Sequence, residues 1–323
     1  MTGAGISTTD SRPLFTTMVM SSWQSFFVDR FRRIARPSAV SADTGIADLR
    51  ARYGAMFEAY GAPPREATFE PTQIGPMKGD WVRCPNSSPN RLILYFHGGG
   101  YVAGSPQTHR ALVARLAQAS EATAFCLDYR LAPEFVFPAA VRDGIDAYRH
   151  VIAKGVAPES IVFAGDGSGG GLAFAVLFAA RNANLPMPAG CIAMSPWADL
   201  SLSGWSVMKN ALTDTKLSWE LLFVSARYYL KKTNPCDAYA SPAFANFKNF
   251  PPIMVHAGSL ELLHDDASRL GDRAADAGVP VSVEIYDGME HVFQASRAPE
   301  GKVSLQRLGH FIRSRTAAQQ NAA

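Results

Sequence analysis

The chain has 323 residues, of which 47% are hydrophobic and 18% charged, so it can bury one large α/β core. Its net charge is only +3, and no cluster of Lys and Arg is interleaved with aromatic residues, which excludes a nucleic-acid partner. The cysteines lie far apart and fit neither a zinc spacing nor a small disulfide framework, so we expect free thiols and no metal: Cys84, Cys126, Cys191 and Cys236.

The start of the chain has no feature of a secretory signal. Residues 1–10 lack a basic region followed by an apolar core. The apolar stretch from Pro13 to Val28 is interrupted by polar residues and is too short to span a bilayer. We therefore expect a cytoplasmic protein without stable membrane insertion.

Residues 14–60 are predicted to be helical and amphipathic. Apolar side chains recur there at helical spacing in two stripes: Phe15, Val19, Trp23, Phe26, Phe27 and Phe31, then Ile46, Leu49, Tyr53, Met56 and Phe57. Because this segment precedes the predicted sheet, it must pack on top of or beside it. We expect a cap over a pocket, with a surface membrane anchor as the alternative.

Strands and helices then alternate along the chain. Residues Ala67–Val82 have the pattern of an antiparallel edge, with Gly75-Pro76 and Lys78-Gly79 as turn signals. Apolar runs predict buried strands at Leu92–Phe96, Ala122–Leu127, Ile161–Ala164, Cys191–Met194, Ile253–Ala257 and Val281–Tyr286. Helices are predicted at His109–Ala119, Ala139–Lys154, Leu172–Ala183, Asp266–Ala277 and Lys302–Arg315. This alternation indicates an α/β fold, with a mostly parallel sheet covered by helices on both faces.

One long segment breaks the alternation. Residues Leu200–Phe250 are poor in strand signals and contain an aromatic helical stretch around Trp219 and Phe223. We interpret this segment as an inserted lid.

A glycine-rich heptad, Gly165 to Gly171, follows the predicted strand Ile161–Ala164. A short strand, a tight glycine turn and a helix form the layout of a nucleophile elbow, whose motif is G-x-S-x-G. In the register set by Gly165 and Gly169, the position of the serine is occupied by Gly167.

The same heptad also fits the dinucleotide-binding motif G-x-G-x-x-G. A Rossmann unit needs a carboxylate about 20 residues further on to bind the ribose. Residues 184–190 contain none, and the motif lies in the middle of the chain, after at least two strand–helix units. We therefore expect no nucleotide cofactor.

The sequence His97-Gly98-Gly99-Gly100-Tyr101 follows the first buried strand. Consecutive glycines leave backbone N–H groups open to a ligand, and in acyl transfer such donors stabilise the oxyanion by about 3–4 kcal/mol each. A tight turn that merely needs glycine is the alternative. The elbow would add the N–H of Ser168 as a further donor.

Candidates for the base and the acid follow the last two predicted strands. Of the seven histidines, His291 has the best context, between a glycine turn and the C-terminal helix, where an α/β-hydrolase carries its general base. Glu261 lies just past the strand Ile253–Ala257, where its carboxylate can orient the imidazole. Asp265 and Asp266 compete for this role, but they lie where the next helix starts and suit N-terminal caps. We favour Glu261.

Together these motifs resemble the hormone-sensitive-lipase-like (bacterial family IV) carboxylesterases of the α/β-hydrolase fold. The resemblance runs through residues 97–105, Asp128 to Glu134, Phe137 to Ala140, the heptad, Ser195 to Asp199, Gly258 to Asp266 and Tyr286 to His291. It implies an N-terminal helical cap (1–60), a hydrolase domain (61–323) and a cap insertion (200–250). It also implies hydrolysis of short- to medium-chain acyl esters without a metal or cofactor, and relatives that are often homodimers. A subgroup with Gly-Ser-x-Glu uses glutamate, which supports Glu261.

The chain departs from the family at Gly167, where the relatives carry the nucleophilic serine. Ser168 then occupies the oxyanion-donor position, and its side chain should point away from the elbow tip. We therefore expect substrate binding without the covalent step, through an engineered knock-out or a natural loss. Retention of His291 and Glu261 favours the former.

Two other functions stay open. The same triad permits amide hydrolysis, and the scaffold could also serve as a non-catalytic small-molecule-binding protein, as in the plant hormone receptors that resemble this family. Aromatic side chains are expected to contact an apolar acyl or alcohol group: Phe15, Trp23, Phe27, Tyr101, Trp219 and Phe223.

Overall fold

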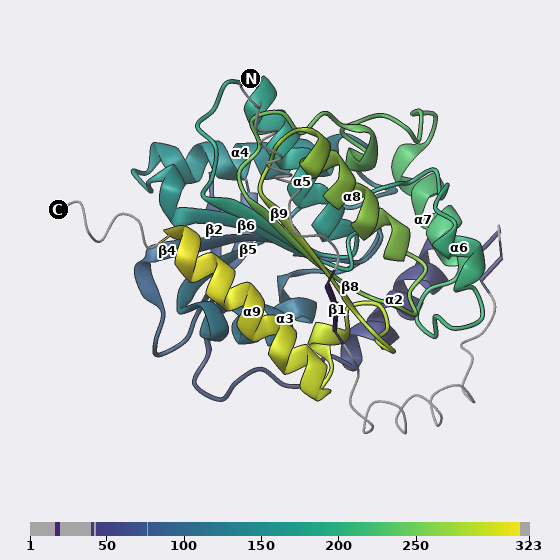
Figure 1. Ribbon diagram of the computed structural model, residues 1–323, viewed down its shortest axis with the longest axis horizontal. Helices are drawn as coiled ribbons and strands as arrows, with labels where there is room; N and C mark the ends of the chain where they lie inside the picture. The colour runs from purple at the N-terminus through teal and green to yellow at the C-terminus, as the bar shows by residue number, and fades with distance from the viewer. Residues whose placement is uncertain (1–16, 20–39, 42, 76, 317–323) are drawn as a thin grey trace, which may run out of the picture.

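The computed structural model describes residues 17–19, 40–41, 43–75 and 77–316 (Figure 1). Within them, nine strands form one sheet in the order β1-β9-β8-β7-β6-β4-β5-β3-β2. The antiparallel pairs are β2 with β3 and β3 with β5, and all other neighbours are parallel. The strands are β1 (Thr17–Val19), β2 (Thr68–Ile74), β3 (Met77–Arg83), β4 (Ser88–Phe96), β5 (Ala122–Asp128), β6 (Ile161–Asp166), β7 (Gly190–Met194), β8 (Ile253–Gly258) and β9 (Val281–Tyr286).

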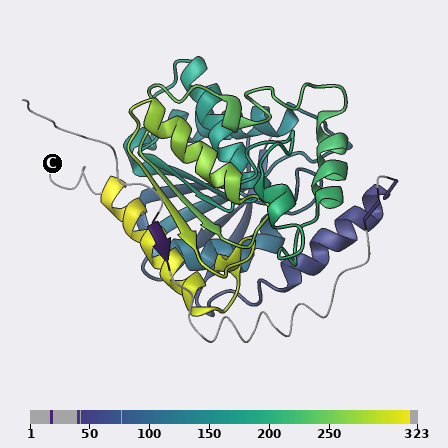
Figure 2. The same cartoon turned by 45° about the vertical axis from the view of Figure 1, so that its right-hand side comes forward.

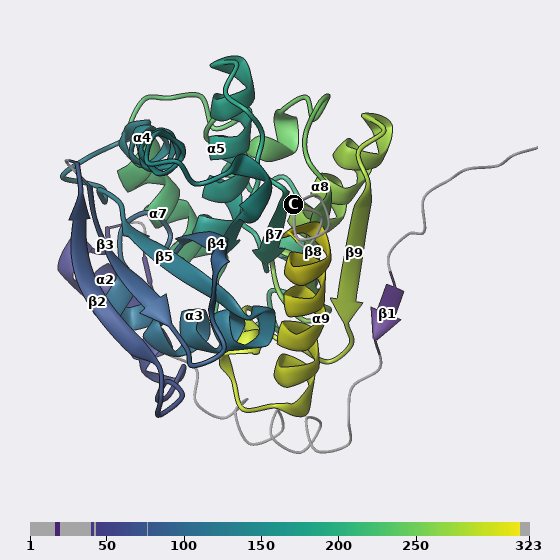
Figure 3. The ribbon, with the colours of Figure 1, turned by 90° about the vertical axis from the view of Figure 1, so that its left-hand side faces the viewer.

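Helices cover both faces of the sheet (Figures 1 and 3). On one face α3 packs against α9, and α4, α5 and α8 lie on the other. Every residue of β6 and β7 is buried, which explains their unbroken apolar sequence. The helices are α3 (Pro106–Ser120), α4 (Ala139–Ala153), α5 (Ser168–Asn182), α8 (His264–Asp276) and α9 (Pro299–Thr316). The predicted α/β class, with its mostly parallel sheet, is confirmed.

Three further helices lie together at one end of the sheet (Figure 2). They are α2 (Ile46–Glu58), α6 (Ser206–Lys209) and α7 (Trp219–Leu230). The hydroxyls of Tyr53 on α2 and Ser225 on α7 lie 3.0 Å apart, so the two helices are joined by a buried hydrogen bond. Residues 200–250, all of which the structure describes, contain helices and turns but no strand, in agreement with the sequence pattern.

The N-terminal prediction is wrong in one part. Thr17–Val19, expected in a helix, form the strand β1 parallel to β9, with Thr17 opposite Glu284. Without β1, β9 would be an edge with unpaired N–H and C=O groups, and pairing satisfies them. Ile46–Glu58 is helical as expected, whereas Phe15, Trp23, Phe26, Phe27 and Phe31 lie outside the described residues.

A second correction concerns Lys78-Gly79, which lie inside β3 rather than in a turn. A Cβ on Gly79 would lie 2.5 Å from the carbonyl oxygen of Cys126 and 2.5 Å from the ring of Phe125. The glycine therefore permits close contact with β5, whereas the turn between β2 and β3 lies at Gly75, whose φ is +59°.

Candidate active site

The strand β6 turns sharply into α5 at Gly167, whose φ is +52° and ψ −123°. Glycine adopts a positive φ without strain, whereas a residue with a Cβ is strained there, and strained turns of this kind are typical of active sites. An ideal Cβ built on Gly167 lies 3.3 Å from Nε2 of His291 and 3.9 Å from Cα of Gly98. A side chain at position 167 would thus start beside the imidazole and beside the glycine loop after β4.

Glycines on either side of this turn allow strand and helix to meet. A Cβ on Gly165 would lie 2.2 Å from the carbonyl oxygen of Gly169, and one on Gly169 would lie 2.1 Å from the carbonyl oxygen of Phe96. Helix α5 starts at Ser168, four residues before the predicted Leu172, so the prediction of its start is corrected. Glycine disfavours a helix, so the sequence pattern did not indicate these residues as helical, but the close packing leaves no room for larger side chains.

His291 and Glu261 form a buried pair beyond the ends of β9 and β8. Nδ1 of His291 lies 2.8 Å from Oε2 of Glu261. The other carboxylate oxygen, Oε1, accepts the N–H of Gly258 at 2.7 Å. Glu261 is 0% exposed and His291 only 7%. With Nδ1 directed at the carboxylate, Nε2 is the ring nitrogen that faces position 167.

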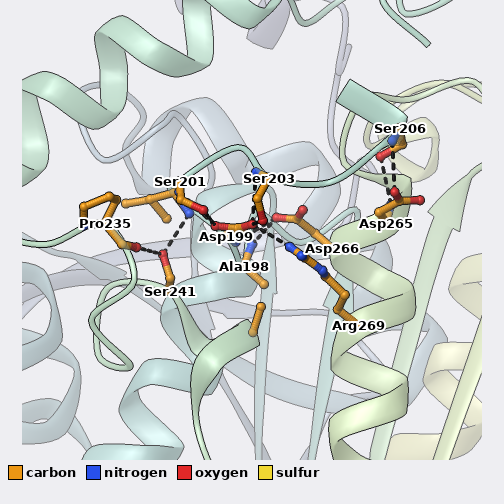
Figure 4. A network of polar contacts seen from close by, with 12 residues as sticks. Ala198, Asp199, Ser201, Ser203, Ser206, Pro235, Ser241, Asp265, Asp266 and Arg269 are labelled. Atoms are coloured by element: carbon orange, nitrogen blue, oxygen red, sulfur yellow. Dashed lines mark hydrogen bonds and ion pairs between the residues drawn. The ribbon is translucent and has the colours of Figure 1, made fainter. Parts of the chain in front are cut away.

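Asp265 and Asp266, the competing acids, bind elsewhere (Figure 4). Oδ2 of Asp265 accepts the N–H of Ser206, and Oδ2 of Asp266 accepts the N–H groups of Ala198 and Asp199. Burial, followed by the nearby carboxylate of Asp199, raises the pKa of Asp266 well above its usual value. Neither side chain caps its own helix, which corrects the expected role.

The glycine loop after β4 is anchored from behind by Asp166. Its Oδ1 accepts the N–H of Gly98 at 3.1 Å and the hydroxyl of Tyr95 at 2.6 Å, and its Oδ2 lies 3.3 Å from Nε2 of His109. Burial would raise the pKa of Asp166, but His109 and the Tyr95 hydroxyl outweigh it, and the pKa is lowered. The N–H of Gly98 is thus directed at Asp166.

The remaining candidate donors are the N–H groups of Gly99, Gly100 and Ser168. Both glycines have positive φ, +122° and +62°. The hydroxyl of Ser168, which is 2% exposed, accepts the N–H of Tyr101 at 3.3 Å. It therefore points toward the glycine loop and not toward His291.

His97 supports the same loop. Its ring stacks on Tyr129 at a centroid distance of 4.2 Å, and Nδ1 lies 2.9 Å from the carbonyl oxygen of Gly98. Burial, assisted by the neighbouring His109, lowers the pKa of His97 to about 3. The ring is therefore neutral at physiological pH.

A cleft opens over Gly167 and is walled by apolar side chains from the end of the sheet, α2, α7 and the loop before α7. Its lining is Tyr53, Met56, Phe57, Tyr60, Gly98, Gly99, Gly100, Asp166, Gly167, Ser168, Trp197, Leu217, Leu222, Leu263 and His291. Helix α2 was predicted as a cap, but no sequence signal marked Leu217, Leu222 or Leu263 as site residues.

The predicted contact residues of the cleft are placed differently. Tyr101 is 1% exposed and stacks on Tyr229 at 4.0 Å, which makes it part of the loop support. Trp219 and Phe223 stack on each other at 4.6 Å on α7, and Trp219 is 45% exposed. Their neighbour Leu222 lines the cleft instead. Phe15, Trp23 and Phe27 lie outside the described residues.

Asp214, which the sequence did not indicate as a site residue, lies near the pair formed by His291 and Glu261. Asp214 is buried, and burial raises its pKa to about 6 in spite of nearby His291 and backbone N–H donors.

The described residues contain no group of His, Cys, Asp and Glu that could hold a metal ion. Nor do they include a helix of the length and apolarity that crossing a bilayer requires.

Comparison with known proteins identifies the family. A family characterised by the alpha/beta hydrolase fold matches residues 93–295. An acetyl-hydrolase from Streptomyces hygroscopicus is 39% identical over 272 residues, which cover 83% of this chain and 89% of that protein. An esterase from Acinetobacter venetianus is 35% identical over 256 residues, which cover 78% and 84% respectively.

Solved structures agree. The crystal structure of an esterase/lipase from an uncultured bacterium has a TM-score of 0.86 and 38% identity, and the match covers 92% of this chain and 100% of that one. An esterase of the bacterial hormone-sensitive lipase family has a TM-score of 0.85 and 36% identity, with 92% and 99% covered. The fold and the site thus define an α/β hydrolase. The chain belongs to the ester-hydrolysing α/β-hydrolase family, and its likeness to hormone-sensitive-lipase-type esterases is confirmed.

Proposed function

We propose that this scaffold hydrolyses carboxylic esters with short to medium apolar acyl or alcohol groups, and that Gly167 leaves this chain able to bind them without the covalent step. The observation that carries the proposal is the 3.3 Å between a Cβ at position 167 and Nε2 of His291. Support for the short acyl range comes from the Streptomyces hygroscopicus relative, which is named an acetyl-hydrolase.

With serine at position 167, the reaction has two halves. The serine oxygen bonds to the acyl carbon while Nε2 of His291 takes its proton, and Glu261 stabilises the imidazolium through Nδ1. The N–H groups of Gly99, Gly100 and Ser168 would hold the oxyanion. Collapse breaks the ester C–O bond, and the alcohol leaves with the proton from His291. Water then attacks the acyl-enzyme by the same route and releases the acid and the serine.

With glycine at position 167 there is no oxygen to attack the ester. The remaining groups can still bind and polarise it, so a residual rate on the order of 10³–10⁴ over water is expected, as in other hydrolases that have lost a triad member. We further propose that α2 and the insertion 200–250 act as the cap that selects the apolar group.

The test is Gly167→Ser, assayed on p-nitrophenyl acetate, butyrate and octanoate. We expect restored turnover, a burst of p-nitrophenol, and a mass increase after treatment with a serine-directed phosphonate. The unchanged protein should give neither the burst nor the adduct, and no turnover beyond the residual rate. Ser168→Ala in the Gly167→Ser background is the control and should retain the phosphonate adduct.

Two results would overturn the assignment. If Gly167→Ser neither turns over nor forms the adduct, position 167 is not the nucleophile position. If Ser168→Ala removes the activity and the adduct, the register of the elbow is shifted by one residue. Turnover of a p-nitroanilide at a rate comparable with the ester would favour amide hydrolysis.

A further inference from the structure

The segment Ser206–Leu217, called here the brace, carries three buried polar side chains spaced four residues apart. Ser206, Asn210 and Asp214 are 2%, 6% and 8% exposed. Buried polar groups need hydrogen-bond partners, so the contacts of these residues show what the segment holds in place. All three reach the acid loop, defined as Ser259–Asp265, which contains Glu261.

Two of these side chains bind the two ends of one peptide group. Nδ2 of Asn210 donates to the carbonyl oxygen of Glu261 at 2.8 Å, and Oδ2 of Asp214 accepts the N–H of Leu262 at 2.8 Å. That carbonyl and that N–H belong to the peptide between Glu261 and Leu262. Because both polar atoms are bound, rotation of the peptide plane would break two hydrogen bonds, which favours one direction for the Glu261 side chain.

Further contacts hold the rest of the acid loop. Asn210 also donates to the carbonyl oxygen of Ser259 at 3.1 Å. Ser206 and Asp265 exchange two hydrogen bonds, from each backbone N–H to the other side chain, at 2.9 and 3.1 Å (Figure 4). The loop is thus bound before, at and after Glu261.

The brace also holds the loop of the base. Nζ of Lys216 donates to the carbonyl oxygen of His291 at 2.6 Å, and the hydroxyl of Thr215 donates to the carboxylate of Glu290. Oδ1 of Asp214 accepts the N–H groups of Lys216 and Leu217, which closes the turn that carries Lys216. One segment therefore contacts the acid loop on one side and the base loop on the other.

We propose that Asn210 and Asp214 are positioning residues that hold the Glu261–Leu262 peptide, so that the Glu261 carboxylate meets Nδ1 of His291. The inference rests on the proposed function. Neither residue touches the reacting atoms, and each acts through the acid loop. Displacement of catalytic groups by about 1 Å can lower a rate on the order of 10²-fold, so loss of this anchor should be visible in catalysis.

The test uses the protein as it stands, with Gly167. An imidazole Nδ1–H bonded to a buried carboxylate gives a proton NMR signal far downfield of the amides, and His291→Asn assigns it. In Asp214→Asn the amide NH₂ faces the N–H of Leu262 and that hydrogen bond is lost. Asn210→Ala removes the donor at the other end of the same peptide. We expect the signal to shift upfield or disappear by exchange in both variants.

Ser241→Ala is the matched control. Ser241 is a fully buried residue of the same insertion with two hydrogen bonds to backbone groups, from Leu200 N–H and to the Pro235 carbonyl, neither of which lies in the acid or base loop (Figure 4). It should lower the thermal midpoint and leave the His291 signal unchanged. In the Gly167→Ser background, Asp214→Asn and Asn210→Ala should lower kcat by about 10- to 100-fold, and Ser241→Ala by less than about threefold.

The outcomes separate the two proposals. If Gly167→Ser is inactive, the proposed function fails while the NMR signal still tests the anchor. Suppose that Gly167→Ser is active. If Asn210→Ala and Asp214→Asn then leave the His291 signal unchanged, and lower kcat no more than Ser241→Ala does, the positioning role is overturned. Should Asp214→Asn fail to fold, Asn210→Ala decides the question alone, because it only removes a donor.

Discussion

The acid of the candidate triad can be tested by Glu261→Gln in the Gly167→Ser background. The two carboxylate oxygens have different partners, since Oε1 accepts the N–H of Gly258 at 2.7 Å and Oε2 faces Nδ1 of His291 at 2.8 Å. In glutamine, the amide oxygen should stay on Gly258 and the NH₂ group should face His291. Nδ1 then becomes the acceptor, and the ring proton moves to Nε2. An Nε2–H cannot take the proton of a serine at position 167.

The size of the expected fall in kcat follows from the cost of turning the glutamine amide around. Turning the amide would restore the correct tautomer, but it would place NH₂ against the buried N–H of Gly258, which costs about 1–3 kcal/mol. The productive form is then a minor one, about 10- to 100-fold disfavoured. Loss of the negative charge beside the imidazolium adds to this, and a carboxylate-to-amide change in a serine–histidine–aspartate triad lowers kcat by about 10⁴-fold. We expect a fall in kcat on the order of 10³–10⁴, with KM nearly unchanged.

The assay is steady-state hydrolysis of p-nitrophenyl butyrate by Gly167→Ser with and without Glu261→Gln. Glu284→Gln is the control, because Glu284 is also buried and its carboxylate lies 3.3 Å from Nε2 of His256. That change removes a salt bridge to Arg307 and should lower stability but not kcat. A Glu261→Gln enzyme within tenfold of its parent would refute the assignment. A large loss in Asp265→Asn or Asp266→Asn instead would identify the acid among those two.

Two further predictions concern stability. Burial lowers the pKa of His256 to about 4, and burial with the nearby His109 lowers that of His97 to about 3. Both pKa values lie below the unfolded value near 6.5. The contribution of each neutral histidine to the free energy of unfolding is therefore complete above about pH 6.5. It is lost as the pH falls, by about 3 kcal/mol for each histidine at pH 4. Urea unfolding should show this loss, and His256→Asn should reduce the pH slope; an unchanged slope would contradict the burial argument. Gly54 lies within α2, and a Cβ added there meets no atom within 4 Å, so Gly54→Ala should raise the free energy of unfolding by about 0.5–1 kcal/mol. A Cβ on Gly165 would lie 2.2 Å from a backbone oxygen, so Gly165→Ala should lower the free energy of unfolding by on the order of 3 kcal/mol or more. Equal thermal midpoints for these two variants would contradict both predictions.

Buried parallel strands were the part of the fold that could be predicted best. β6 and β7 are buried at every residue, so their sequence is an apolar run with a clear beginning and end. β1 could not be predicted, because three residues give no pattern and their partner β9 lies more than 260 residues away. Gly79 was misread because a glycine that permits a close strand contact and one that makes a turn look alike in sequence.

The candidate site, too, could be predicted only in part from the sequence. The elbow, the glycine loop and His291 are encoded in short contiguous motifs, and the structure brings them together around Gly167. The preference for Glu261 over Asp265 and Asp266 could only be argued from loop position, whereas the hydrogen bonds separate the three carboxylates directly. The role of the Gly98 N–H depends on Asp166, which lies 68 residues away in sequence.

The groups around Gly167 also hold the fold together, and this changes how their retention should be interpreted. Glu261 binds the N–H of Gly258 as well as His291, and Asp166 binds both Gly98 and Tyr95. Loss of either would leave buried donors without partners, at a cost of about 1–3 kcal/mol each. These residues therefore stabilise the fold as well as line the candidate site, so their presence alone does not distinguish an engineered knock-out from a natural loss. In Gly167→Ser, the serine would therefore enter a site in which Glu261 and the glycine loop are already held by hydrogen bonds of the fold.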